Sequence, residues 1–360
     1  MSVLPLILAA AINASPGSVQ GTDGVRLVRV NEVPLAVDGC SGIAYSGKGN
    51  LFYFLQDHGD DGRSRVYPMA LDIDFSTGAV KSSPTPGASF VPGRCTDAEG
   101  IAYDVDYGRV WISDEKVPTV AEYGLDGAMT GRAVALPKIQ LTKKRSNKSL
   151  ESLTISPDGR TLWTANEQAL FCDGDSSCGN ATVKTVVRLM KYTRASATAG
   201  WTAAGQWAYA CDVCEVAASA ECGVSGLCAL EDGSLLVLER EVSVSSFGRC
   251  RIYRLAPSVF SMATDVTAFA ALKKSAYTAV AKGDPLVDFS SGRMEAMYVY
   301  EGITLGPRLR DGSRAVYLVS DGGETSTRTV LGVSMTARTA SLVCALKLTG
   351  VGAASPAAKR

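Results

Sequence analysis

The residues Glu99-Gly100-Ile101-Ala102-Tyr103, followed after a short turn by Val110-Trp111-Ile112-Ser113-Asp114-Glu115, decide the fold. Two runs of residues that favour β-strands flank a turn that contains Asp and Gly, and this pattern predicts an antiparallel hairpin. The first strand opens on an acidic residue and a glycine, and the second strand ends in acidic residues. The unit is informative because it returns along the chain.

Four further hairpins share this design. They cover residues 41–57, 151–167, 225–241 and 301–321. Successive units begin about 50 to 75 residues apart, which leaves room for two more strands in each repeat. Repeats of this size, built of strands throughout, are typical of propeller blades. We therefore expect an all-β protein with the β-propeller fold.

The ends of the chain suggest how the ring closes. A strand predicted at residues 25–33 precedes the first hairpin, and we expect it to pair with the last blade, beside residues 330–333 or 342–348. Such pairing closes the ring and removes an exposed sheet edge. The propeller is then a single domain over residues 25–348, and the small and polar residues 349–360 form a disordered tail.

Composition narrows the classes of partner. Hydrophobic residues make up 46% of the chain, and 36 basic residues balance 36 acidic ones. Dedicated binders of nucleic acids or membrane surfaces usually carry a basic excess, so the balance argues against both classes. We expect a monomer that acts on a small molecule.

The first 14 residues predict export. An apolar run from residue 3 to 12 precedes small residues that suit signal peptidase, although the start carries no Lys or Arg. No later stretch approaches the roughly 20 apolar residues of a membrane span. We expect a protein that is secreted, or periplasmic if the source is bacterial.

An even number of cysteines, ten, fits an oxidising compartment. Cys172 and Cys178 flank a short loop and predict a local disulfide, and Cys40 and Cys344 could join the two ends of the domain. A cluster that includes a C-x2-C spacing allows either disulfides or a zinc site, with disulfides favoured in an exported chain. Its members are Cys211, Cys214, Cys222 and Cys228.

The hairpins also gather carboxylates. In an antiparallel pair, the first residue of one strand lies beside the last residue of its partner. This places Glu99 beside Asp114 and Glu115. The other hairpins contribute Glu151 with Asn166 and Glu167, Glu301 with Asp321, Asp57 with His58, and Glu239 with Arg240. If these hairpins are the innermost strands of successive blades, the side chains converge on one mouth of the channel.

A channel mouth lined by so many carboxylates needs positive charge nearby, because neighbouring carboxylates repel one another. Calcium accepts six to eight oxygen ligands in loose geometry, whereas zinc prefers His or Cys. His58 is the only histidine, so a site with several histidines is excluded. Single acidic residues at strand ends are often solvated or paired with Arg, but their recurrence at equivalent positions favours a cation site.

These residues resemble the phytase-like family, also called esterase-like activity of phytase. The resemblance spans roughly residues 38–348, and its most specific stretch is Glu301-Gly302-Ile303-Thr304-Leu305-Gly306-Pro307, followed by Asp311-Gly312 and Val319-Ser320-Asp321. It implies a six-bladed propeller and phosphoester hydrolysis assisted by calcium. Since only five blades are visible, the sixth is expected between about residues 256 and 294.

The resemblance also implies the ligands of the cation. They are Asp57, Glu99, Asp114, Glu151, Glu239, Glu301 and Asp321. Two features depart from the family pattern: the fourth hairpin opens on Ser225-Gly226 without an acid, and cysteine-rich insertions lie between residues 172 and 228.

The hypothesis is a hydrolase of phosphate esters. His58, Glu115 and Glu167 are its candidate catalytic residues, and Lys116, Lys148 and Arg240 its candidate contacts to substrate phosphate. Two alternatives stay open: a propeller that binds a ligand or protein without catalysis, and a calcium-dependent lactonase or carboxylesterase. The absence of a G-x-S-x-G motif argues against serine-hydrolase chemistry.

Overall fold

A computed structural model of the chain describes residues 24–177, 182–215, 220–242, 248–289, 299–322, 325–330, 333–338 and 340–351, the two segments between 325 and 338 by their backbone alone. The expected signal peptide at residues 1–14 and most of the expected tail at 349–360 lie outside these ranges. Within them, no helix is long and apolar enough to cross a membrane.

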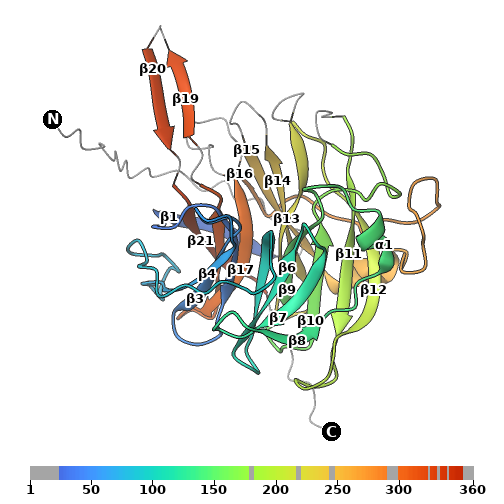
Figure 1. Ribbon diagram of the computed structural model, residues 1–360, viewed down its shortest axis with the longest axis horizontal. Coiled ribbons are helices and arrows are strands. Elements are labelled where there is room, and N and C mark those ends of the chain that lie inside the picture. The colour runs from blue at the N-terminus through green and yellow to red at the C-terminus, as the bar shows by residue number, and fades with distance from the viewer. Residues whose placement is uncertain are drawn as a thin grey trace, which may run out of the picture.

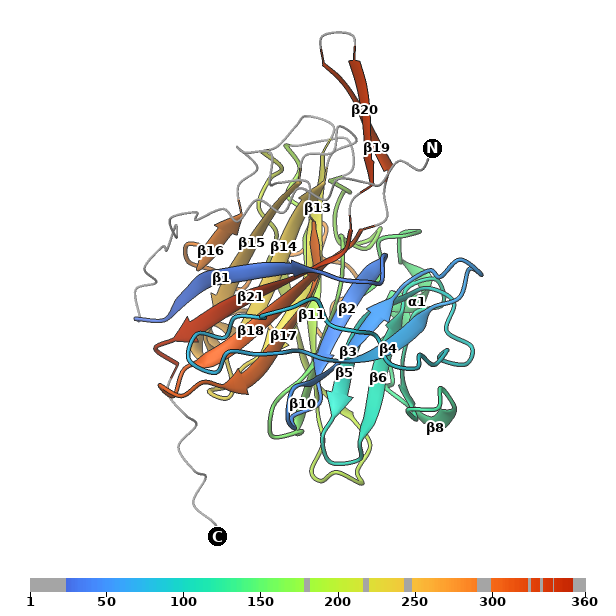
Figure 2. The ribbon, with the colours of Figure 1, turned by 90° about the vertical axis from the view of Figure 1, so that its left-hand side faces the viewer.

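The described strands form five blades, each a sheet of antiparallel neighbours (Figures 1 and 2). The first blade contains β2 (Cys40–Tyr45), β3 (Leu51–Gln56) and β4 (Arg65–Ala70). The second contains β5 (Ala98–Asp104), β6 (Arg109–Asp114), β7 (Thr119–Tyr123) and β8 (Met129–Ala133). The third contains β9 (Leu150–Ile155), β10 (Thr161–Asn166), β11 (Val186–Thr193) and β12 (Thr202–Ala210).

The fourth blade contains β13 (Glu221–Ala229), β14 (Leu235–Val242), β15 (Gly248–Leu255) and β16 (Val287–Phe289). The fifth contains β17 (Tyr300–Arg308), β18 (Arg314–Ser320), β21 (Leu342–Thr349) and β1 (Arg26–Pro34), with β1 paired antiparallel to β21. Two short helices, α1 (Lys138–Thr142) and α2 (Pro257–Met262), lie between strands. A separate hairpin, β19 (Thr325–Val330) and β20 (Val333–Arg338), projects from the body in both views.

The expectation of six blades is wrong. The innermost strands β2, β5, β9, β13 and β17 contact one another in cyclic order, so five blades already complete the circle. The segment expected to hold a sixth blade instead covers the third blade, where Val266 N donates to Gln206 O and Val280 N to Ala208 O, both at 2.8 Å. It then supplies β16, the fourth strand of the fourth blade.

Each innermost strand carries a β-bulge at the same place. In the second blade, Ala98 pairs with Asp114 and Gly100 with Ser113, which leaves Glu99 as the extra residue. The equivalent extra residues in the other blades are Ser41, Glu151, Ser225 and Glu301. A bulge re-aims the side chain that it carries, and bulges of this kind recur beside active sites.

Glycine follows the bulge in four of the five strands and permits their close approach. A Cβ added at Gly302 would lie 2.9 Å from Gly42 Cα and 2.9 Å from Ile43 N, in the backbone of the neighbouring blade. A Cβ at Gly100 would lie 2.7 Å from Leu153 N. These positions therefore exclude side chains because the next inner strand occupies the space.

The next position is aliphatic in every blade and closes the channel. Its residues are Ile43, Ile101, Leu153, Leu227 and Ile303. The space left among the five strands at this level is only about 10 Å³, roughly that of one water molecule. The propeller thus has two separate hollows, one at each mouth, rather than an open pore.

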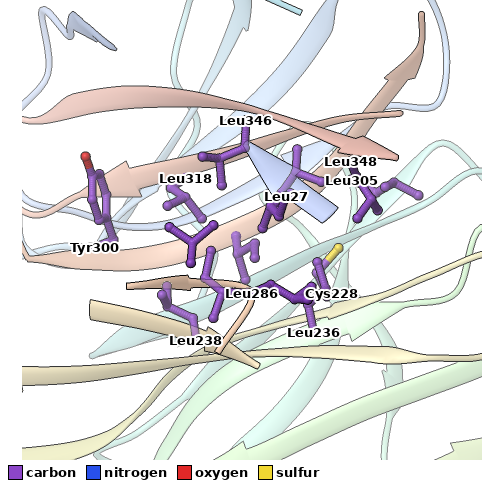
Figure 3. Packing of buried hydrophobic residues seen from close by; sticks show 14 of the residues in the cluster. Leu27, Cys228, Leu236, Leu238, Leu286, Tyr300, Leu305, Leu318, Leu346 and Leu348 are labelled. Carbon is purple, nitrogen blue, oxygen red and sulfur yellow. The ribbon is translucent and has the colours of Figure 1, made fainter. Parts of the chain in front are cut away.

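The blades are held together by apolar side chains packed between neighbouring sheets. Between the fourth and fifth blades, Leu236 and Leu238 face Leu305, Leu318 and Leu346 (Figure 3). All but Leu305 are 0% exposed. Burial of a leucine side chain contributes about 1.5–3 kcal/mol, so such clusters stabilise each blade contact.

The structure pairs none of the nine described cysteines in a disulfide. Cys178 of the expected Cys172–Cys178 pair lies outside the described residues. Cys40 packs with the first and fifth blades, whereas Cys344 packs with the fourth and fifth, so the expected tie between them is not formed. Cys214 and Cys222 share one small buried cluster as free thiols.

Replacing Gly302 with Ala should lower the free energy of unfolding by about 1–3 kcal/mol, the usual cost of overpacking, because the new methyl group meets backbone atoms that cannot move aside. Urea denaturation measures the change. The matched control is Gly283→Ala, where nothing lies within 4 Å of the added Cβ and the stability should hold or rise slightly. Equal losses in both variants would contradict the close packing of the inner strands.

Candidate functional site

One mouth of the propeller is hollowed into a cavity of about 280 Å³. Its lining contains nine carboxylates: Asp57, Asp97, Glu99, Glu115, Glu151, Glu167, Glu221, Glu301 and Asp321. Among the described residues, the lining sets two permanent cations, Lys148 and Arg240, together with His58, against these carboxylates. The convergence of strand ends on an acidic mouth, predicted from the hairpins, is therefore present in the structure.

Three of the bulge residues form the centre of the site. Carboxylate oxygens of Glu99, Glu151 and Glu301 lie within 4.8 Å of one another. The bulges of the other two blades carry serines, which bind the neighbouring blade instead: Ser41 Oγ donates to Ala98 O and Ser225 Oγ to Tyr300 O, both at 3.0 Å. Acidic side chains thus approach the axis from three blades, and hydroxyls from the other two secure the ring.

A second layer comes from one equivalent position in each hairpin, the residue that follows the strand partner of the residue before the bulge. This position lies just beyond the second strand in four blades and within β14 in the fourth. In the five blades this position is Asp57, Glu115, Glu167, Arg240 and Asp321, and all five line the cavity. In the fourth blade it is Arg240, an arginine where every other blade has an acid. The guanidinium therefore reaches the carboxylates of other blades.

Arg240 is the main counter-ion of the site. Its Nη2 lies 3.1 Å from Glu151 Oε1 and 2.9 Å from Glu167 Oε1, and its Nη1 contacts Glu301. Burial disfavours the charged guanidinium, but these carboxylates outweigh burial and raise the pKa of Arg240. Lys148 extends this half of the site, with Nζ 3.2 Å from Glu167 Oε2 and 3.1 Å from Glu221 Oε1.

The other half of the site lacks such compensation. Among the described residues, the Glu99 carboxylate has no hydrogen bond and no ion pair, and burial followed by repulsion from Glu151 and Glu301 raises its pKa well above the ordinary value. Burial raises the pKa of Glu115 to about 7, although Ser149 N donates to its Oε1 at 2.5 Å. Burial and then Glu301 and Asp57 raise the pKa of Asp321 to about 8.

His58 lies at the edge of this uncompensated half. Its Nδ1 is 3.1 Å from Asp57 Oδ2 and its Nε2 is 3.5 Å from Asp97 Oδ1, while 53% of the side chain is exposed. Asp97 and Glu221 were not singled out from the sequence. Asp97 stands only two residues before Glu99, and that short acidic spacing is the signal that could have identified it.

Three of the predicted residues lie outside the cavity lining. Asp114 holds a loop, accepting from Thr96 N at 2.7 Å and Val117 N at 2.9 Å. Lys116 is exposed beyond the rim. Glu239 belongs to a neighbouring polar cluster, where it accepts from Tyr209 Oη at 2.5 Å, from Asp212 N at 3.0 Å and from Lys282.

The physical reason is strand alternation. Successive side chains of a strand point to opposite faces, so of two consecutive residues at a strand end only one faces the axis. The structure selects Glu115 over Asp114 and Arg240 over Glu239. This choice changes the site, because it exchanges an expected acid of the fourth blade for a cation.

The lining could hold a hard cation. Carboxylates that could bind one ion form three groups: Asp97 with Glu99 and Glu115, Glu99 with Glu151 and Glu301, and Glu115 with Glu151 and Glu167. The donors are all oxygen atoms, as calcium or magnesium prefers. The unpartnered Glu99 belongs to two of these groups, as do Glu115 and Glu151, so a place with little counter-charge also offers several potential ligands.

Several solved structures are similar to this chain at 11% sequence identity. The tail fibre of Staphylococcus aureus phage P68 matches 92% of this chain with a TM-score of 0.45, and the chain spans only 54% of that protein. A nidogen/laminin complex matches 85% of this chain and 84% of its own, with a TM-score of 0.38. The periplasmic gluconolactonase of Pseudomonas aeruginosa matches 84% of both chains, with a TM-score of 0.35.

No curated protein matches this chain in sequence. A family model does match, over residues 35–322, and its description is Phytase-like, esterase-like activity of phytase. These residues include all five bulges and the whole acidic cavity lining. The chain therefore belongs to the Phytase-like family.

Proposed function

We propose that this protein is a calcium-dependent hydrolase of phosphate esters that acts at the acidic cavity. The observation that carries the proposal is the Glu99 carboxylate, which is enclosed with Glu151 and Glu301 and has no cation partner among the described residues. Burying a carboxylate without a partner is costly, so such a group either takes up a proton or binds a cation.

The donor set suits calcium. Glu99, Glu151 and Glu301 would hold one ion at the axis, and Asp97 and Glu115 would extend the site toward the second blade. Calcium tolerates irregular arrangements of six to eight oxygen ligands, which fits carboxylates supplied by different blades. When bound, the ion would reduce the negative charge of the cavity and stabilise charge on the phosphoryl oxygens.

Residues of the chain itself would bind the substrate phosphate and supply a proton. Lys148 and Arg240 lie in the compensated half of the cavity and would donate hydrogen bonds to a substrate phosphate, a charge-assisted contact that Arg makes well. Glu167 contacts both cations and would hold them in position. His58, exposed between Asp57 and Asp97, would hold a proton at the edge of the cavity for the leaving group.

A carboxylester or lactone is the second candidate substrate. The description of the matching family names an esterase-like activity, and a carbonyl substrate could use the same cation and donors. We further propose that the protein is exported, on the strength of the apolar residues 3–12. A panel of substrates separates the two ester classes from a propeller that only binds.

Purified protein should release phosphate from phosphomonoesters, including phytate, in the presence of calcium, and chelation should abolish the release. Glu99→Gln and Glu301→Gln each remove a ligand charge and should lower kcat/KM at least 100-fold, measured by phosphate release. The matched control is Asp72→Asn, an exposed carboxylate paired only with Lys81, which should keep full activity.

Four other outcomes would redirect the proposal. Turnover of carboxylesters or lactones alone would assign the second substrate class. Turnover that survives chelation, or folded Glu99→Gln protein with full activity, would remove the calcium site from the mechanism. A folded, calcium-loaded protein that hydrolyses nothing in the panel would be a binding propeller.

The raised carboxylate pKa values predict a pH dependence of stability. Glu115 and Asp321, with pKa values of about 7 and about 8, bind more protons in the folded than in the unfolded protein. The contribution of these two groups to the stability of the folded protein is thus fully present below the ordinary carboxyl pKa, and it is lost as pH rises through about 7 and 8. Without metal, Tm should fall from pH 5.5 to pH 8.5, and calcium should raise Tm more at pH 8.5.

Thermal unfolding followed by circular dichroism, in chelator or in calcium, measures both effects. In the metal-free protein, Glu99→Gln should make the decrease in Tm between pH 5.5 and pH 8.5 smaller, because it removes one of the repelling carboxylates. Asp72→Asn should leave the fall unchanged. A metal-free Tm that rises between pH 5.5 and pH 8.5 would contradict the charge repulsion in the cavity.

A further inference from the structure

The mouth opposite the acidic cavity holds a second, larger hollow of about 470 Å³. We call it the basal cavity. Its lining comes from the far ends of all five inner strands, and its floor is formed by four of the five aliphatic side chains that close the channel. Tyr45, Val105, Ile155 and Leu305 supply apolar parts of its wall, which polar atoms share. The basal cavity is therefore separate from the acidic cavity and different in chemistry.

Two arginines lie together at the edge of the basal cavity. Arg308 and Arg314 face each other directly across the β17–β18 hairpin. Like charges directly opposite on paired strands are destabilising. One carboxylate serves both: Glu231 contacts Arg308 Nη2, and its Oε1 lies 3.5 Å from Arg314 Nη1. The group of three charged side chains keeps a net positive charge.

Arg314 is the less satisfied of the two. Only 17% of its side chain is exposed, and its guanidinium donates no hydrogen bond to any residue in the described part of the chain. Its Nε is fully buried without a partner. Burial lowers the pKa of Arg314 despite the nearby Glu231. A guanidinium carries five donors, and leaving them unpaired in a buried place costs free energy that an anionic acceptor would recover.

We propose that the basal cavity binds an amphiphilic anion, with its apolar part on the aliphatic floor and its carboxylate or sulfonate on Arg314. The planar guanidinium suits a carboxylate because it can donate two parallel hydrogen bonds. The volume lies within the range of small-molecule sites, which combine an apolar lining with a few polar groups. The site goes beyond the proposed function, because the closed channel separates it from the acidic cavity.

The test uses decanoate as the probe and isothermal titration calorimetry of the full chain. Decanoate should bind at one site per molecule. Decanol, which has the same chain without the charge, and acetate, which has the charge without the chain, should each bind at least tenfold more weakly. Arg314→Met keeps the volume but removes the donors, and should weaken decanoate binding at least tenfold.

Two controls accompany this variant. Arg26→Met removes an exposed arginine from β1, the outermost strand of the fifth blade, and should leave decanoate binding unchanged. Glu99→Gln changes the acidic cavity alone and should also bind decanoate like the parent chain. The Tm of Arg314→Met should match or exceed that of the parent, because the lost guanidinium has no hydrogen bond in the described structure.

The proposal is overturned if the folded parent chain binds no decanoate, if decanol binds as tightly as decanoate, or if Arg314→Met keeps the parent affinity. Altered affinity in Glu99→Gln, with Arg314→Met unaffected, would move the ligand to the acidic cavity.

Discussion

The close approach of five strands around one axis is the constraint on which the rest of the structure depends. Three consecutive positions in each inner strand meet it. The first position holds the bulged residue, such as Glu99. The second holds a small residue, such as Gly100, because the backbone of the next inner strand lies close to it. The third holds an aliphatic side chain, such as Ile101. The bulge aims side chains at one mouth, the glycine lets the backbones meet, and the aliphatic ring seals the channel.

This arrangement concentrates charge that the protein must then balance. Three bulge carboxylates meet at the axis, and in the described part of the chain Arg240 and Lys148 supply cations to one half of the cavity only. The other half leaves Glu99 without a partner in the described structure. The two halves of the cavity therefore suit different ligands. The half with Arg240 and Lys148 suits anionic groups, and the half without these cations suits a divalent cation.

The closed channel also separates the two mouths of the propeller, whose lining side chains carry net charges of opposite sign. Nine carboxylates line the described part of the acidic mouth, whereas the opposite mouth combines apolar side chains with Arg308 and Arg314. Both follow from the same hairpins, since one end of each hairpin holds the bulge and the other holds the turn. The same set of hairpins can therefore supply two cavities of different chemistry, because the closed channel keeps the two cavities apart.

Much of this protein could be predicted from local sequence. The hairpins, the propeller class, the Phytase-like family and the meeting of Asp57, Glu99, Glu151, Glu301 and Asp321 at one mouth all follow from short patterns, because strand pairing and turn chemistry are local. The number of blades does not, since it depends on how five inner strands close on one another. Tertiary structure likewise chose Arg240 over Glu239 and added Asp97, because facing and bulge geometry decide which side chain reaches the axis. It alone brought Glu231 to Arg308 and Arg314, since contacts between blades join residues far apart in the chain.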